Sequence, residues 1–167
     1  MNESKYKKMN DYMAESKSRS STIKALHDIL PVIMMFFYPV QLLYLLFTTG
    51  FKNEVFLKAT FIPLLVLVLV TAMRYLVNAK RPYEVYSYSP VVPKKTKGKS
   101  FPSRHTACAF IIAMAFLYID VKVGVVMMVL AFLIGITRIV SGVHFVRDVI
   151  GGALISIIIG LVGFFLI

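Results

Sequence analysis

The sequence predicts an all-α fold: a polytopic membrane helix bundle of about five transmembrane helices with a polar or interfacial N-terminal arm. Of its 167 residues, 58% are hydrophobic, and the mean hydropathy is +0.76, well above what soluble domains show. A chain of this length forms one domain, which cannot hide so much apolar surface from water. Lipid is therefore the expected solvent, and the expected localisation is the cell membrane, as a multi-pass protein.

The polar N-terminal arm covers residues 1–25, and residues 26–167 form a single transmembrane domain. Within the arm, Tyr6, Met9 and Met13 recur at roughly helical spacing, which suits a short helix lying on the membrane surface. A disordered tail is the alternative. Both alternatives place the arm outside the hydrocarbon core.

Five apolar runs follow, and we expect each to be a helix, because lipid requires backbone groups to be paired within their own segment. The third run is short for a crossing that needs about 20 residues. In the last run, small residues recur every fourth position at Gly152, Ser156 and Gly160, which lets another helix approach closely. The runs are Leu26–Thr48, with Pro31 and Pro39 as expected kinks, Val55–Val77, Ser103–Ile119, Val123–Val140 and Phe145–Ile167.

One long polar connection, Asn78–Pro102, separates the second and third runs and contains five lysines and three tyrosines. We expect it to lie exposed at the membrane face, with Ser100 accessible to a labelling reagent. The tyrosines Tyr83, Tyr86 and Tyr88 suit either a ring around an anionic headgroup or the ordinary aromatic belt of a membrane interface. Four of the lysines form a cluster, namely Lys94, Lys95, Lys97 and Lys99.

The net charge of +11 would suggest a nucleic-acid partner if the protein were soluble. Here the basic residues cluster at the ends of apolar runs, where they can contact anionic lipid headgroups. We therefore expect membrane lipids and anionic headgroups as partners and no nucleic acid. A homo-oligomer is left open.

Charged groups at the ends of membrane helices point to function, and the first such cluster closes the second run. Arg74 and Arg81 are seven residues apart, close to two helical turns, so both can project from one face. Two planar guanidinium forks suit a phosphate better than ammonium groups do. The alternative is that both residues mark the boundary between lipid and water.

The second cluster, Pro102-Ser103-Arg104-His105, opens the third run. Proline followed by serine is a natural helix start, and the free amides at such a start form an anion site together with the serine hydroxyl. His105 lies one step inside the helix, ready to donate a proton. A simple helix cap is the alternative.

The third cluster joins the fourth and fifth runs, with Thr137-Arg138 before the connection and His144 and Asp148 after it. Positions four residues apart can share one helical face. A carboxylate there can accept the proton of one imidazole nitrogen, which leaves the lone pair of the other nitrogen free to attack.

With these three clusters in order, the chain resembles the type 2 phosphatidic acid phosphatase family, membrane lipid phosphatases related in fold to the vanadium haloperoxidases. The family signature is lysine, six residues, Arg-Pro; then Pro-Ser-Gly-His; then Ser-Arg, five residues, His, three residues, Asp. The resemblance covers about residues 74–152. The motifs read here as Arg74 and Arg81-Pro82, then Pro102-Ser103-Arg104-His105, then Thr137-Arg138, His144 and Asp148.

Three positions depart from the signature. Arg74 in place of lysine keeps the charge and adds a donor fork, and Thr137 in place of serine keeps the hydroxyl. Arg104 in place of glycine puts a bulky cation beside the phosphate, where it either contacts a second phosphate or acidic headgroup or points into solvent.

The resemblance implies the role of each residue. His144 would attack phosphorus and form a phosphohistidine, with Asp148 orienting its ring, and His105 would protonate the leaving lipid oxygen and then activate water. No cofactor is expected, and no metal either, since arginines would supply the charge that magnesium supplies elsewhere. The phosphate-binding residues would be Arg74, Arg81, Ser103 and Arg138, with Arg104 as a further candidate.

The implied activity is hydrolysis of the terminal phosphate of phosphatidic acid, phosphatidylglycerol phosphate or a polyprenyl pyrophosphate. The alternatives are a non-catalytic protein that binds anionic lipids and a lipid phosphotransferase that uses the same site. Basic residues on the two sides of the bundle place the site towards the cytosol by the positive-inside rule, whereas the resemblance favours an outward-facing site.

Overall fold

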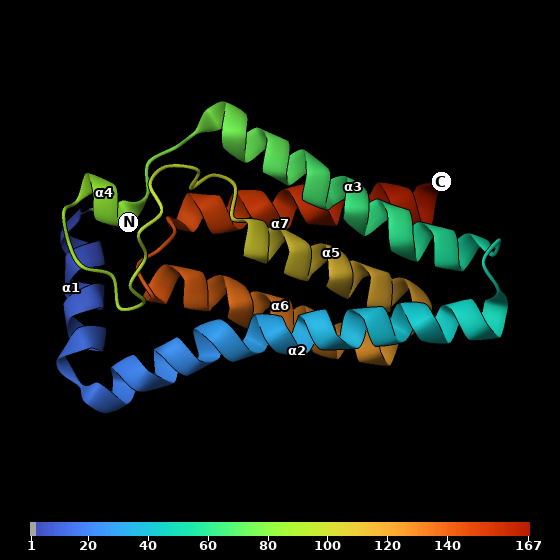
Figure 1. Ribbon diagram of the computed structural model, residues 1–167, viewed down its shortest axis with the longest axis horizontal. Helices are drawn as coiled ribbons and strands as arrows, with labels where there is room; N and C mark the ends of the chain where they lie inside the picture. The colour runs from blue at the N-terminus through green and yellow to red at the C-terminus, as the bar shows by residue number, and fades with distance from the viewer. Residues whose placement is uncertain (1–2) are drawn as a thin grey trace.

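The computed structural model describes residues 3–167, which form helices and loops only, so the predicted all-α class is confirmed. The helices run back and forth along one long axis, apart from α1 and the short α4 at one end (Figure 1). In chain order they are α1 (Glu3–Glu15), α2 (Lys17–Thr49), α3 (Glu54–Val77), α4 (Pro82–Val85), α5 (Arg104–Ile119), α6 (Val121–Val140), α7 (Val146–Gly160) and the π-helical η1 (Leu161–Leu166).

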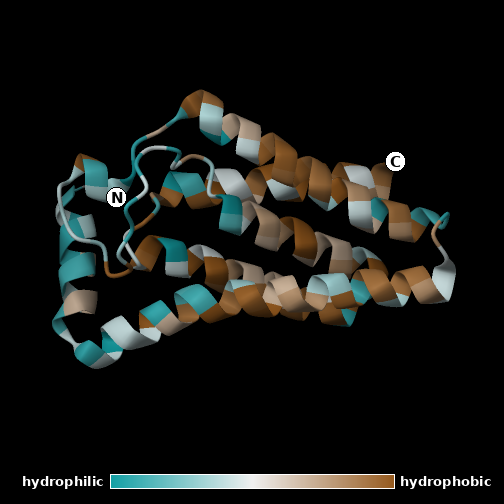
Figure 2. Cartoon of the chain, viewed as in Figure 1, coloured by the Kyte–Doolittle hydropathy of each residue, from teal (hydrophilic) through white to brown (hydrophobic). Residues whose placement is uncertain are grey.

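Within residues 3–167, four helical segments are long and apolar enough to cross a membrane: α2, the segment that contains α3, α6, and α7 with η1. Their outward faces carry exposed hydrophobic side chains, such as Phe47 at 83% exposed and Leu76 at 85%. Hydrophobic residues cover most of the bundle, whereas hydrophilic residues gather at the end where α1 and α4 lie (Figure 2). The predicted multi-pass membrane bundle is therefore confirmed.

The remaining apolar helix, α5, lies at the centre of the bundle. Ten of its 16 residues are buried, and it packs against α6, α7, α3 and α2. At 1.5 Å per residue, 16 residues span only about 24 Å, less than the hydrocarbon core of a bilayer. The shortness noted in the sequence thus belongs to a helix whose neighbours, and not lipid, surround most of its surface.

Small residues on α7 bring that helix close to the start of α5. A Cβ atom at Gly152 would lie 2.7 Å from the carbonyl oxygen of Ser103, so only glycine fits there. The hydroxyl of Ser156 donates to the carbonyl of Ala107 at 2.8 Å, and the amide of Ser103 donates to the carbonyl of Asp148 at 2.8 Å. The small-residue pattern therefore packs on a helix of the same chain and fixes two functional motifs side by side.

The N-terminal arm forms helix α1, which crosses the end of the bundle (Figure 1). Tyr6 is 1% exposed, and its hydroxyl accepts a hydrogen bond from the amide of Val146 at 2.9 Å. Its ring packs edge-on against Phe145 with 5.4 Å between ring centroids. Of the two alternatives for the arm, the structure has the helix, and α1 holds the loop before α7.

One expectation about the first long helix was inexact. It begins at Lys17 and not near Leu26, because the hydroxyl of Ser16 accepts the amide of Arg19 at 3.5 Å and caps a helix start outside the apolar run. Pro31 and Pro39 both lie inside this continuous helix.

Candidate active site

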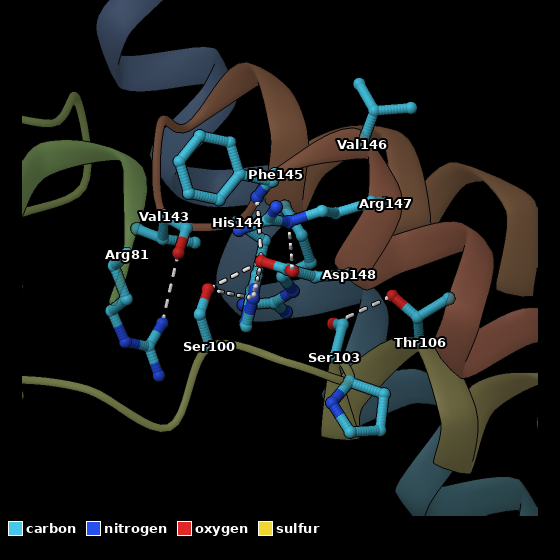
Figure 3. Close-up of polar contacts among 12 residues, drawn as sticks. Arg81, Ser100, Ser103, Thr106, Val143, His144, Phe145, Val146, Arg147 and Asp148 are labelled. Atoms are coloured by element: carbon cyan, nitrogen blue, oxygen red, sulfur yellow. Dashed lines mark hydrogen bonds and ion pairs between the residues drawn. The ribbon is translucent and has the colours of Figure 1, made fainter. Parts of the chain in front are cut away.

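His144 and Asp148 lie in contact at the end of the bundle that α1 crosses (Figure 3). His144 is 2% exposed, and its Nδ1 atom lies 3.4 Å from Oδ2 of the fully buried Asp148. His144 precedes α7, so the two residues do not share a helical face as expected. The capping turn joins them instead, because Oδ2 of Asp148 also accepts the amide of Phe145 at 2.9 Å.

Ser100 is a third member of this group that sequence reasoning misjudged. Its hydroxyl donates to Oδ2 of Asp148 at 2.5 Å and lies 3.4 Å from Nδ1 of His144. Its amide donates to the carbonyl of Ala79 at 2.8 Å. The residue is fully buried, so the expectation of an accessible position was wrong. The connection between α4 and α5 thus places the Ser100 hydroxyl against His144 and Asp148.

Burial lowers the pKa of His144 to about 4, although the hydrogen bond to Asp148 acts in the opposite direction. Nearby Arg81 lowers this pKa further. The imidazole is therefore neutral at pH 7. If Nδ1 keeps its proton for Asp148, the lone pair of Nε2 is free, which is the state that a nucleophilic imidazole requires.

The three arginines of the motifs are held by uncharged acceptors. Arg74 donates to the carbonyl of Pro102 at 3.0 Å, and Arg81 donates to the carbonyls of Gly98 and Val143, each at 3.1 Å. Within residues 3–167, no ion pair joins these arginines to a carboxylate. Their positive charge thus stays available to an anion.

Arg81 does not lie on the same helix as Arg74. The helix α3 ends at Val77, where Asn78 adopts a left-handed conformation, and Arg81 is the N-cap residue of α4. The expected shared face two turns apart was therefore wrong. The two side chains are nevertheless electrostatic neighbours, because the loop returns towards the bundle.

The third motif arginine, Arg138, is 2% exposed and reaches α2. Its Nη2 atom donates to the carbonyl of His27 at 2.8 Å, and Nη1 contacts Nε2 of the same residue. His27 is the one histidine outside the three motifs. An ionisable residue inside a membrane segment is by itself a functional signal, and that signal could have identified His27 from the sequence.

The motif at the start of α5 divides between the interior and the surface. Ser103 is fully buried, and its hydroxyl accepts a hydrogen bond from that of Thr106 at 3.0 Å. His105 is half-buried and Arg104 is exposed. Both line a cavity of about 420 Å³ between α5 and its neighbours.

Among the four clustered lysines of the polar connection, Lys94 has a pKa that the arginines of the site lower. Burial lowers its pKa to about 8, and the charges of Arg81, Arg138, Arg74 and Arg104 act in the same direction. Lys95 and Lys97 are exposed. The cluster of four lysines is therefore divided, with Lys94 turned towards the arginines.

The tyrosines of the connection hold loops together. Tyr88 donates to the carbonyl of Gly142 at 2.9 Å, and Tyr83 donates to the carbonyl of Thr96. The ring of Tyr86 packs against Phe145 with 5.8 Å between centroids. Gly142 has a φ of +77°, a conformation that glycine adopts without strain.

In the part of the chain that the structure describes, no group of three or more histidine, cysteine, aspartate or glutamate side chains is arranged to hold a metal ion. The acidic side chains of the site accept hydrogen bonds from the chain itself, although Oδ1 of Asp148 has no hydrogen-bond partner. Asp148 accepts from Ser100 and from the backbone, and Glu84 accepts from the amides of Arg81 and Gly98.

Known proteins resemble the chain in sequence and in structure. It is 34% identical over 84 residues to undecaprenyl-diphosphatase BcrC of Bacillus subtilis, a match that covers 50% of this chain and 43% of the relative. It is 39% identical over 79 residues to the bacitracin transport permease protein BcrC of Bacillus licheniformis, covering 46% of this chain and 39% of the relative. The match thus spans less than half the length of either relative.

Two solved structures share the fold. The crystal structure of LpxE from Aquifex aeolicus superimposes with a TM-score of 0.74 at 28% identity, covering 97% of this chain and 93% of that one. A PAP2-type phosphatidylglycerolphosphate phosphatase from Bacillus subtilis gives 0.64 at 22% identity, covering 98% and 82%. The family model of the PAP2 superfamily matches residues 41–166. The chain belongs to the PAP2 superfamily.

Proposed function

We propose that this chain is an integral membrane phosphatase that hydrolyses the terminal phosphate of a lipid phosphate or lipid diphosphate through a phosphohistidine, without a metal ion. The observation that carries the proposal is the contact between neutral His144 and Asp148 beside guanidinium groups from separate segments of the chain. The name of the Bacillus subtilis relative, an undecaprenyl-diphosphatase, supports the same reaction class.

In the first step, Nε2 of His144 attacks phosphorus while Nδ1 keeps its proton and donates it in a hydrogen bond to Asp148. The bond between phosphorus and the leaving lipid oxygen breaks, and His105 gives that oxygen a proton. In the second step, His105 takes a proton from water, and the water oxygen displaces His144 from phosphorus. Inorganic phosphate leaves, and both histidines return to their starting state.

The arginines stabilise the charge that moves onto the phosphoryl oxygens during both steps. Arg74, Arg81 and Arg138 are each anchored by backbone carbonyls, so their orientation is set before the substrate arrives. Preorganised charge of this kind needs no reorganisation during the reaction. It also removes the need for a divalent cation to neutralise the phosphate.

The test is phosphate release by the purified protein from phosphatidic acid, phosphatidylglycerol phosphate and a polyprenyl diphosphate, with and without EDTA. We expect release from at least one lipid, unchanged by EDTA and lost in His144→Ala. Lys24→Gln, an exposed change on α2, is the control and should retain the wild-type rate.

Three outcomes would contradict the proposal. Loss of activity in EDTA that a divalent ion restores would contradict the metal-free reaction. Binding without release across the panel would favour a protein that binds anionic lipids. Transfer of phosphate to an added alcohol in place of water would favour a phosphotransferase.

A further inference from the structure

The cavity beside the site has apolar walls and one cationic end. Arg104 and His105 line it where α5 begins, and every other lining residue is apolar. Val32 and Met35 on its rim are 66% and 59% exposed, so the cavity is open on the lipid-facing side of α2. Its volume of about 420 Å³ is in the range of small-molecule sites, and a hydrocarbon chain is the ligand that such walls accept.

The in-line geometry of phosphoryl transfer orients the substrate relative to this cavity. The attacking and leaving groups lie on opposite sides of phosphorus. If His144 attacks and His105 protonates the leaving oxygen, the remainder of the leaving group extends on the side of His105. That side is the cavity, and Arg104 is the first charged side chain along it.

Five cationic side chains gather at the site. Lys94 is an electrostatic neighbour of four arginines, and the carboxylates near these cations are Asp28, Glu84 and Asp148. A lipid diphosphate carries two negative charges on its terminal phosphate and one on the inner phosphate, so it offers these cations one more charge than a monophosphate does. A lipid monophosphate carries two. The cations are Arg74, Arg81, Lys94, Arg104 and Arg138.

We propose that Arg104 binds the inner phosphate of a lipid diphosphate, so that the substrate class is a lipid diphosphate whose hydrocarbon chain occupies the cavity. This inference rests on the proposed function. It assigns a role to the residue at which the chain departs from the glycine of the family signature. Arg104 is then a specificity-determining residue, because a monophosphate has no group in its reach.

The reaction balances as one lipid diphosphate and one water giving one lipid monophosphate and one inorganic phosphate. The bond from Nε2 of His144 to the terminal phosphorus forms as the bond from that phosphorus to the bridging oxygen breaks. The bridging oxygen takes the proton of His105 and leaves on the lipid monophosphate. Arg104 neutralises the charge that gathers on this leaving group.

The test compares farnesyl diphosphate with farnesyl phosphate, which share one hydrocarbon chain, as substrates of the purified protein. We expect wild type to prefer the diphosphate in kcat/KM by at least about 10-fold, the effect of one hydrogen bond to a charged group. Arg104→Gln should lower kcat/KM for the diphosphate by about 10- to 100-fold and change the monophosphate by less than about 3-fold. Arg104→Lys should restore part of the preference.

Controls separate this inference from folding and from the proposed function. Glutamine is a good helix former, and the retained monophosphate activity of Arg104→Gln reports that the protein is folded. Arg104→Gly is the second variant should glutamine fail, and Lys24→Gln removes an exposed charge on α2 and should change neither substrate. Equal wild-type rates on both substrates, or an equal loss on both in Arg104→Gln, would overturn the inference and leave the phosphatase intact. No release by wild type from either farnesyl substrate and from any lipid of the panel above would overturn the proposed function itself.

Discussion

Replacing Ser100 with alanine removes the shortest hydrogen bond that Asp148 accepts. Three contacts converge on Oδ2 of Asp148: the Ser100 hydroxyl at 2.5 Å, the Phe145 amide at 2.9 Å and Nδ1 of His144 at 3.4 Å. Since two contacts remain, the carboxylate stays in place but loses the group that restrains its rotation. The longest of the contacts, to the imidazole, is the one that this freedom weakens.

The magnitude follows from the chemistry of the lost bond. A hydrogen bond to a charged group contributes about 1.5–3 kcal/mol. If that stabilisation is fully expressed in the transition state, kcat falls by about 10- to 100-fold at 1.4 kcal/mol per factor of ten. KM should change little, because Ser100 contacts the residue that orients the nucleophile and not the phosphate itself.

Steady-state kinetics of Ser100→Ala and Ser100→Thr on one lipid substrate test this role. Threonine keeps the hydroxyl and should recover part of kcat. Ser89→Ala, an exposed change in the same connection, should match wild type. A kcat for Ser100→Ala within about 2-fold of wild type, or a change confined to KM, would refute the reasoning.

Four further predictions concern the groups around this pair. Since His144 has a pKa of about 4 and must be neutral to attack, the acidic limb of kcat/KM should lie near pH 4, and an acidic limb near 6.5 would contradict its burial; a loss of activity at high pH belongs to His105, which must carry a proton. Asp148→Asn removes the hydrogen bond that raises this pKa, so the limb should move lower while kcat falls about 10⁴-fold, as in serine protease triads. Tyr6→Phe removes the acceptor for the first amide of α7 and should destabilise the protein by about 1 kcal/mol in thermal unfolding, whereas exposed Tyr12→Phe should leave the melting temperature unchanged. His27→Ala should lower kcat/KM by about 10-fold by freeing the arginine it holds; His27→Gln should recover part of it, and no recovery would point to lost packing.

The membrane bundle and the meeting of its motifs were predictable from the sequence because both depend on local patterns. Apolar length identified the helices, and charged residues at helix ends identified the functional end. The alternation of helix direction then brought residues 74, 105 and 144 to the same end of the bundle. These signals lie within segments of about 20 residues, so a single sequence is sufficient to predict them.

The contacts that complete the site were not predictable, because each joins distant parts of the chain. Ser100 bonds Asp148 across 48 residues, Arg138 bonds His27 across 111, and Val146 bonds Tyr6 across 140. No periodicity encodes such pairings. Loop geometry produced the remaining errors, since the left-handed turn at Asn78 moved Arg81 off its expected helix.

The central claim is that His144 carries the phosphoryl group between lipid and water. The most direct measurement is rapid alkaline quenching of the purified protein during turnover of a ³²P-labelled lipid phosphate, followed by mapping of the labelled peptide. We predict an acid-labile, base-stable label on His144 in wild type and none in His144→Ala. A label on another residue, or turnover by His144→Ala at the wild-type rate, would contradict the account.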